Sequence, residues 1–221
     1  MTIRIIVASL VAALASCITA GLAAADEEAQ YNNQVFFRGA YSALTTNRGG
    51  EIFTDTLATG NANSSRGGWS MAAGLDLSMM EMEDMGGARV MGEIFAEFSQ
   101  FSDQNVVNAA NVAAGVGAGT VRQVNVTSLN VTIAPKVRFD ELGSGRIRPF
   151  VVPVGLAFLV NSPPSNTTSY LDLGLQFGAG VDVLVVDRIS VGADLRYNHS
   201  FDQSQTNNSY WSTGVYAGIN F

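Results

Sequence analysis

The sequence predicts an all-β protein whose eight antiparallel strands close into an up-and-down β-barrel that spans a membrane. Segments of about ten residues alternate between apolar and small or polar side chains, which is the period of a strand and a length that crosses a tilted bilayer. After the N-terminal segment, no run of about eighteen apolar residues predicts a spanning helix. Charged residues make up only 14% of the chain and Gly occurs 23 times, so the composition is apolar without long apolar runs.

The alternation predicts strands at 35–44, 69–77, 89–99, 128–139, 147–160, 171–183, 189–199 and 210–221. The fourth segment shows the pattern clearly, because Leu129, Val131 and Ile133 share one face while Asn130 and Thr132 share the other. A soluble sandwich would also alternate, but its outward face would be charged. Here the polar face is rich in Gly, Ser and Asn, the mixture that fits a narrow barrel interior. Ten strands is the alternative count.

The segment 147–160 is apolar on both faces, so its register is ambiguous. We place its bulkier side chains outward, and these are Phe150, Val152, Val154, Leu156 and Phe158. Pro149 and Pro153 cannot donate ladder hydrogen bonds, which predicts bulges at both positions.

Inward-facing charges are the main candidate site. They are Arg38, Asp76, Glu93, Glu97, Lys136, Arg138, Asp172, Asp182, Asp194 and Arg196. Charges inside so narrow a barrel must pair or be solvated, which favours a structural salt-bridge plug over the alternative, a gated ion path. We expect Arg38 and Asp76 to pair, since both fall near the same ends of neighbouring strands.

The first residues resemble a secretion signal rather than part of the fold. Arg4 precedes an apolar stretch, and Ala23 to Ala25 form a small-residue cleavage site, so residues 1–25 are predicted as a signal peptide. The mature chain then starts at Asp26, with 26–34 as a periplasmic segment and 35–221 as the barrel. Cleavage before Cys17, which would leave that residue lipidated, is the alternative.

The predicted connections alternate in length. Those at 45–68, 100–127, 161–170 and 200–209 are longer than those at 78–88, 140–146 and 184–188. With both chain ends in the periplasm, the longer set faces outward. Residues 52–57 and 121–126 are expected to extend their strands above the membrane.

The closing segment carries a family resemblance. Apolar residues alternate along 210–221 up to a terminal aromatic, and the assembly-signal residues are Phe221, Ile219, Val215 and Trp211. Together with 194–201, this pattern resembles the small eight-stranded outer-membrane β-barrels, such as the OmpA transmembrane domain, OmpX and the opacity proteins. The resemblance implies a monomer in the outer membrane of a Gram-negative cell envelope. It also implies contact with lipids and lipopolysaccharide, and insertion by the barrel-assembly machinery.

This fold carries several kinds of function, so the resemblance is weak evidence for any one of them. The sequence favours a non-enzymatic protein with a structural or adhesion-like role through extracellular loops that contact an external ligand. A narrow, porin-like channel for ions or small solutes is the first alternative. A lipid A-modifying enzyme is the second: His199 is the only histidine, but Ser200 follows it directly, and adjacent strand residues face opposite ways.

Other chemistry has little support. A net charge of −7 argues against nucleic acid as a partner. We expect no cofactor and no metal, although Met79, Met80, Met82 and Met85 lie among acidic residues in the first short turn. Thioethers favour Cu(I), so copper binding there is the alternative to a flexible turn.

Overall fold

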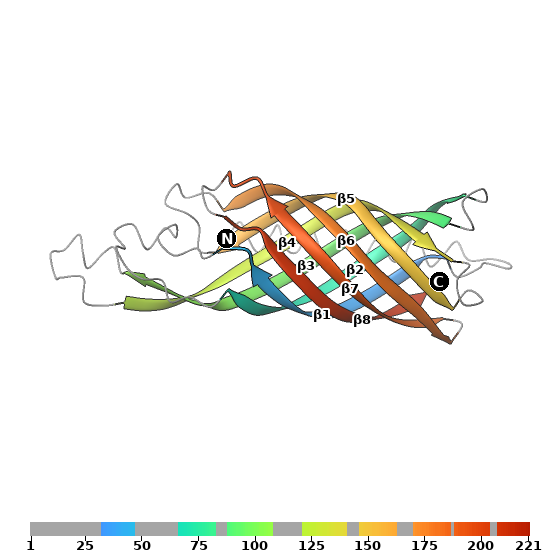
Figure 1. The fold of residues 1–221 in the computed structure, drawn as a ribbon, viewed down its shortest axis with the longest axis horizontal. Coiled ribbons are helices and arrows are strands. Elements are labelled where there is room, and N and C mark those ends of the chain that lie inside the picture. The colour runs from blue at the N-terminus through green and yellow to red at the C-terminus, as the bar shows by residue number, and fades with distance from the viewer. Residues whose placement is uncertain are drawn as a thin grey trace, which may run out of the picture.

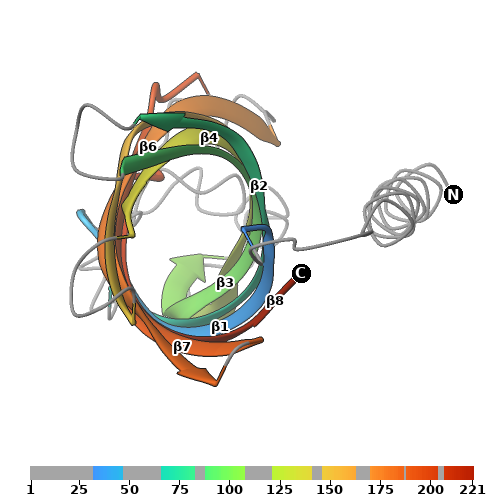
Figure 2. The same ribbon diagram turned by 90° about the vertical axis from the view of Figure 1, so that its right-hand side faces the viewer.

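The computed structural model is a closed barrel of antiparallel strands in which each strand pairs with its neighbours in sequence and the last returns to the first (Figures 1 and 2). The structure describes residues 32–46, 66–82, 88–107, 121–140, 146–162, 170–186, 188–203 and 207–221. The strands are β1 (Gln34–Leu44), β2 (Gly67–Met82), β3 (Ala88–Val107), β4 (Val121–Phe139), β5 (Ile147–Ser162), β6 (Leu171–Val186), β7 (Ile189–Ser200) and β8 (Tyr210–Asn220). The predicted fold class and the count of eight are confirmed.

Several predictions lie outside the described residues. These are the signal peptide, the alternative at Cys17, the extension at 52–57 and a part of each outer connection. No helix within the described ranges is long and apolar enough to cross a membrane.

The two faces of the barrel wall follow the predicted alternation. Many outward side chains are large, apolar and exposed: Phe37 is 64% exposed and Val215 is 67% exposed. Inward neighbours are buried, as Phe36 and Arg38 are at 1% and 3% exposure. An exposed apolar wall around a polar, charged interior is the reverse of a soluble protein and fits a lipid environment.

The barrel closes along a seam between β1 and β8. Gln34 lies opposite Asn220, and Leu44 lies opposite Tyr210. Beyond the seam, Asn33 and Phe221 exchange backbone hydrogen bonds of 3.1 and 3.0 Å. Figure 1 shows the C-terminus at the end of the barrel that carries the short turns. Closure leaves no unpaired strand edge along the wall.

β3 and β4 are the longest strands, at 20 and 19 residues. Their pairing continues to Val107 opposite Val121, past an irregularity between Phe101 and Gln104. In Figure 1 this hairpin runs beyond the other strands at the end opposite the short turns. The expected extension at 121–126 is confirmed, and the predicted connection at 100–127 is correspondingly too long.

The predicted orientation of the fifth strand is wrong in its first half. Phe150 and Val152 point inward, at 2% and 1% exposure, whereas Leu156 and Phe158 point outward as predicted. A register shift between Val152 and Gly155 reverses the alternation. Pro153 lies inside that shift, so the bulge predicted there is confirmed, but Pro149 pairs regularly with Val181.

The first short turn is also shorter than predicted. β2 continues to Met82, with a register shift between Ser78 and Met80. Met79, Met80 and Met82 therefore lie on a strand, and Met85 lies outside the described residues.

Candidate functional site: the charged interior of the barrel

A chain of alternating charges crosses the barrel interior. In order, its members are Asp76, Lys136, Glu93, Arg196, Asp194, Arg38 and Glu97. Each contact joins a carboxylate to a cation, and every side chain in the series is at most 2% exposed. The members come from β1, β2, β3, β4 and β7. This interior ion chain therefore ties together strands that are not neighbours in the wall.

The first half of the interior ion chain is centred on Glu93. Lys136 Nζ lies 2.6 Å from Asp76 Oδ2 and 3.3 Å from Glu93 Oε2. Arg196 binds the other side of Glu93 through two hydrogen bonds. Its Nη1 donates to Glu93 Oε1 at 2.5 Å, and its Nη2 donates to Glu93 Oε2 at 3.0 Å. This fork is the bidentate geometry that makes Arg–carboxylate pairs strong and directional.

The second half is centred on Asp194. Arg196 Nε donates to Asp194 Oδ2 at 2.9 Å, and Arg38 Nε donates to Asp194 Oδ1 at 2.6 Å. Arg38 Nη1 then donates to Glu97 Oε2 at 2.6 Å. The Tyr210 hydroxyl donates to the other Glu97 oxygen at 2.8 Å, which ends the series in a neutral group.

Aromatic rings pack against the cations. The Arg196 guanidinium carbon lies 3.9 Å from the centroid of the Phe95 ring, and Lys136 Nζ lies 4.0 Å from that of Phe150. Lys136 also lies 5.2 Å from the Phe36 ring. These rings belong to a buried apolar layer that includes Ala72, Ala134, Val152 and Tyr216. Cation–π attraction thus adds to the ion pairs, and the rings fill space that water would otherwise enter.

A second apolar layer lies beyond the interior ion chain toward the outer loops. It contains Leu44, Phe101, Val126, Ala157, Leu159 and Tyr210. Between the two apolar layers, Asn130 Nδ2 donates to Asn198 Oδ1 at 2.7 Å, and Gln176 Nε2 donates to the same oxygen at 2.9 Å. Amide side chains from β4, β6 and β7 therefore bond to one another across the interior.

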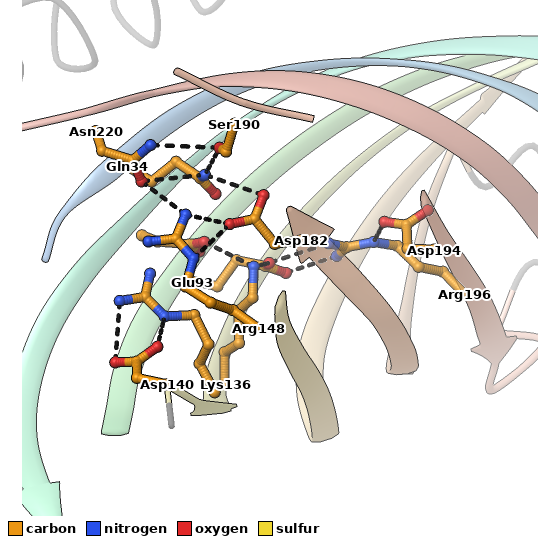
Figure 3. Close-up of polar contacts among 12 residues, drawn as sticks. Gln34, Glu93, Lys136, Asp140, Arg148, Asp182, Ser190, Asp194, Arg196 and Asn220 are labelled. Carbon is orange, nitrogen blue, oxygen red and sulfur yellow. Dashed lines mark hydrogen bonds and ion pairs between the residues drawn. The ribbon is translucent and has the colours of Figure 1, made fainter. Parts of the chain in front are cut away.

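A separate polar group closes the short-turn end of the barrel (Figure 3). Arg148 pairs with Asp182, and its Nη2 also donates to Asn220 Oδ1 at 3.1 Å. Gln34 Nε2 donates to Ser190 Oγ at 2.5 Å. This group joins β1, β5, β6, β7 and β8 across the seam.

Next to this group, the first short turns carry their own pairs. Arg138 Nε donates to Asp140 Oδ1 at 2.6 Å, and Arg89 Nε donates to Asp140 Oδ2 at 3.0 Å. Arg89 also pairs with Glu81 at 3.0 Å. At the opposite end of the barrel, Asp172 accepts hydrogen bonds from Asn161 Nδ2, at 3.1 Å, and from Asn208 Nδ2.

The structure places all ten predicted interior charges at 5% exposure or less. One predicted pairing is wrong: Arg38 binds Glu97 and Asp194, whereas Asp76 binds Lys136. Arg38 lies opposite Ala72 in the register, while Asp76 lies opposite Gln34, so the two charges sit at different heights. Sequence reasoning missed Arg148, because the wrong register for β5 placed it outside. It also missed Arg89.

His199 and Ser200 lie on opposite sides of the wall. His199 is exposed on the outer face, 5.7 Å from the Phe201 ring in an edge contact, whereas Ser200 is 1% exposed and faces inward. Ser200 Oγ accepts the backbone N–H of Asp202 at 3.2 Å. The hydroxyl therefore cannot act as a nucleophile beside this imidazole.

The predicted assembly-signal residues occupy the outer face of the closing strand. Trp211, Val215 and Ile219 are 46%, 67% and 55% exposed. Trp211 stacks on Tyr197 with ring centroids 4.3 Å apart. Within the described residues, no three His, Cys, Asp or Glu side chains gather as a metal site.

Comparison with known proteins identifies the fold. No family model and no curated protein matches this chain. Among solved structures, Neisserial surface protein A has a TM-score of 0.54 at 12% identity, covering 86% of this chain and 97% of that one. The outer membrane enzyme PagL gives 0.48 at 16% identity, with 86% and 99% covered. The N-terminal β-barrel domain of Pseudomonas aeruginosa OprF gives 0.41 at 14% identity, with 86% and 98% covered.

Proposed function

We propose that this chain, an eight-stranded β-barrel with the fold of the small outer-membrane proteins, is a non-enzymatic anchor that presents its loops at the bacterial surface. The observation that carries this proposal is the filled interior. Cross-barrel ion pairs and two buried layers of aromatic and aliphatic side chains occupy it. A barrel of this width, filled by its own side chains, is a rigid support rather than a pore or a binding cavity.

The outer wall supports an outer-membrane location. Its open side chains include Phe37, Met71, Ile133 and Leu195, each between 49% and 64% exposed. Near the loop ends of the strands, Tyr41, Trp69 and Trp211 form an aromatic zone of the kind found at membrane–water boundaries. As part of the same proposal, the barrel is monomeric, contacts lipopolysaccharide and is inserted by the barrel-assembly machinery that reads the end of β8.

The direct test of a filled interior is conductance. The purified full chain, folded into planar bilayers, should show no steady ion conductance. A steady conductance that disappears on reversing the charge at Glu93 or Arg138 would contradict the proposal and support a narrow channel instead.

The test of the surface role uses intact cells. Cells that display the chain should bind a host-cell or matrix surface more strongly than cells without it. Replacing residues 61–65 or 163–166 by Gly–Ser segments of equal length should reduce that binding while leaving the heat-modifiable gel mobility of the barrel intact. Unchanged binding after both replacements would contradict a loop-mediated role.

A further inference from the structure

An open groove of about 550 Å³ lies on the outer wall of the barrel, over β6, β7, β8 and β1. Its lining includes the apolar side chains of Phe37, Val183, Val191, Ala193, Val215 and Ala217. We call this the wall groove. It lies on the lipid-facing surface, so it is separate from the charged interior and from the loops to which the proposed function assigns recognition. Its volume falls within the range of roughly 300–1,000 Å³ that is typical of sites for small ligands.

The strand register explains why the wall is hollowed at this place. Ala193 of β7 lies opposite Val215 of β8, and in the next row Ala217 of β8 lies opposite Phe37 of β1. All four residues are exposed on the outer face, and Val215 and Phe37 are 67% and 64% exposed. The two alanines therefore form a floor, and the larger side chains beside them form the sides of the groove.

The wall groove lies in the half of the barrel next to the short turns. Val191 and Ala193 come soon after the start of β7 at Ile189, and Ala217 comes shortly before the end of β8 at Asn220. With the short turns in the periplasm, this half of the wall contacts the periplasmic leaflet of the outer membrane. That leaflet consists of phospholipids, so their acyl chains are the groups that meet the groove.

The shape of the wall favours an acyl chain over a second barrel as the occupant. Figure 2 looks along the barrel and shows that the wall formed by β7, β8 and β1 is convex. Two convex walls meet along a narrow line, so a second copy would leave much of the groove unfilled. A flexible chain can follow the floor and contact it along its length. Such contact gains the dispersion attraction that a void forfeits.

We propose that the wall groove binds one acyl chain of a phospholipid from the periplasmic leaflet. Inside a membrane this binding brings no hydrophobic gain, because the chain only exchanges one apolar environment for another, so the fit to the floor provides the affinity. The residues that line the groove carry no charge, so the site selects the chain and not the headgroup. This inference goes beyond the anchoring role and rests only on the orientation of the barrel in the membrane.

The test is native mass spectrometry of the full chain, folded in phosphatidylcholine vesicles and then transferred to detergent micelles. We expect a monomer that retains one phospholipid. Ala193→Leu and Ala217→Leu each fill the floor, and each should lower the lipid-bound fraction about tenfold, because the chain loses its close contact with the wall. Phosphatidylglycerol with the same acyl chains should be retained to the same extent as phosphatidylcholine.

A matched control separates the wall groove from the rest of the lipid-facing wall. Ala179→Leu makes the same change at an exposed alanine of β6 that does not line the groove, and it should leave the lipid-bound fraction unchanged. Heat-modifiable gel mobility verifies that each variant is folded.

Three results would overturn the proposal. They are a folded wild-type barrel that retains no phospholipid, a lipid-bound fraction that survives both Ala193→Leu and Ala217→Leu, and a dimer in place of the lipid-bound monomer. Retention of phosphatidylglycerol alone would also overturn it, because the headgroup would then provide the affinity. Each of these results leaves the anchoring role, tested by conductance and cell binding, unaffected.

Discussion

Removing the charge of Lys136 is the most direct perturbation of the interior ion chain. Its Nζ lies 2.6 Å from Asp76 and 3.3 Å from Glu93. Among the described residues, Asp76 has no other salt-bridge partner, whereas Glu93 keeps Arg196. Lys136→Met preserves most of the volume of the side chain. It therefore leaves Asp76 as a buried, uncompensated carboxylate with little change in packing.

The expected magnitude follows from the geometry. Two unit charges 2.6 Å apart attract by about 6 kcal/mol at an effective dielectric constant of roughly 20. Desolvation offsets part of that gain while both partners are present, and it remains uncompensated when one is removed. We expect Lys136→Met to lower the free energy of unfolding by about 3–5 kcal/mol. Adding Asp76→Asn removes the stranded charge and should recover more than half of that loss.

Urea unfolding in lipid vesicles, followed by tryptophan fluorescence and gel mobility, measures both effects. Glu81→Gln is the control, because the Glu81 side chain is 49% exposed. An exposed pair of this kind contributes less than about 1 kcal/mol. If Lys136→Met costs no more than the control, or if Asp76→Asn restores nothing, the interior pairs do not hold the barrel together as argued.

Three further outcomes are expected. Gly74→Ala should lower the free energy of unfolding in urea by about 1–3 kcal/mol, because the new Cβ would clash with the buried Phe36 ring. Gly39→Ala is the control and should be near neutral, because no atom lies within 4 Å of its new Cβ. Partial burial, and then the charge of Asp172, raise the pKa of Asp202 above its ordinary value of 3.8. Its folded state therefore holds the proton more tightly, so acidification through this pKa favours the fold. A carboxyl NMR titration should show this raised pKa, and Asp172→Asn should lower it. His199→Ala should leave the acyl chains of lipid A unchanged by mass spectrometry, and a lost acyl-release product would instead reveal an enzyme.

The barrel is predictable from the sequence because one physical rule governs all its strands. Successive residues of a strand face lipid and the narrow interior in turn, so apolar side chains alternate with small or polar ones. This period of two identifies which residues face inward. The rule fails where both faces are apolar. Side-chain size alone predicts Phe150 and Val152 on the outer face, yet they fill the buried layer against Lys136. Arg148 is in phase with both residues, and its charge indicates the inward register.

The sequence predicts that these charged side chains face the interior, but it does not predict which of them pair with one another. Arg38 lies four register positions from the level of Asp76, and it binds residues of β3 and β7 instead. Strands in a barrel tilt, so side chains at one height come from different positions along each strand. That stagger is a property of the closed structure, and no local pattern in the sequence encodes it.

The ion pairs that cross the interior join residues far apart in the sequence, which bears on when they form during folding. Arg38 and Asp194 are 156 residues apart in sequence, and Arg196 and Glu93 are 103 apart. Contacts between such distant residues form only after the loop between them has closed, so they are made late. Interactions that are absent from the transition state slow unfolding without speeding folding. The interior ion chain therefore contributes little to the rate at which the barrel folds and much to the slowness with which it unfolds.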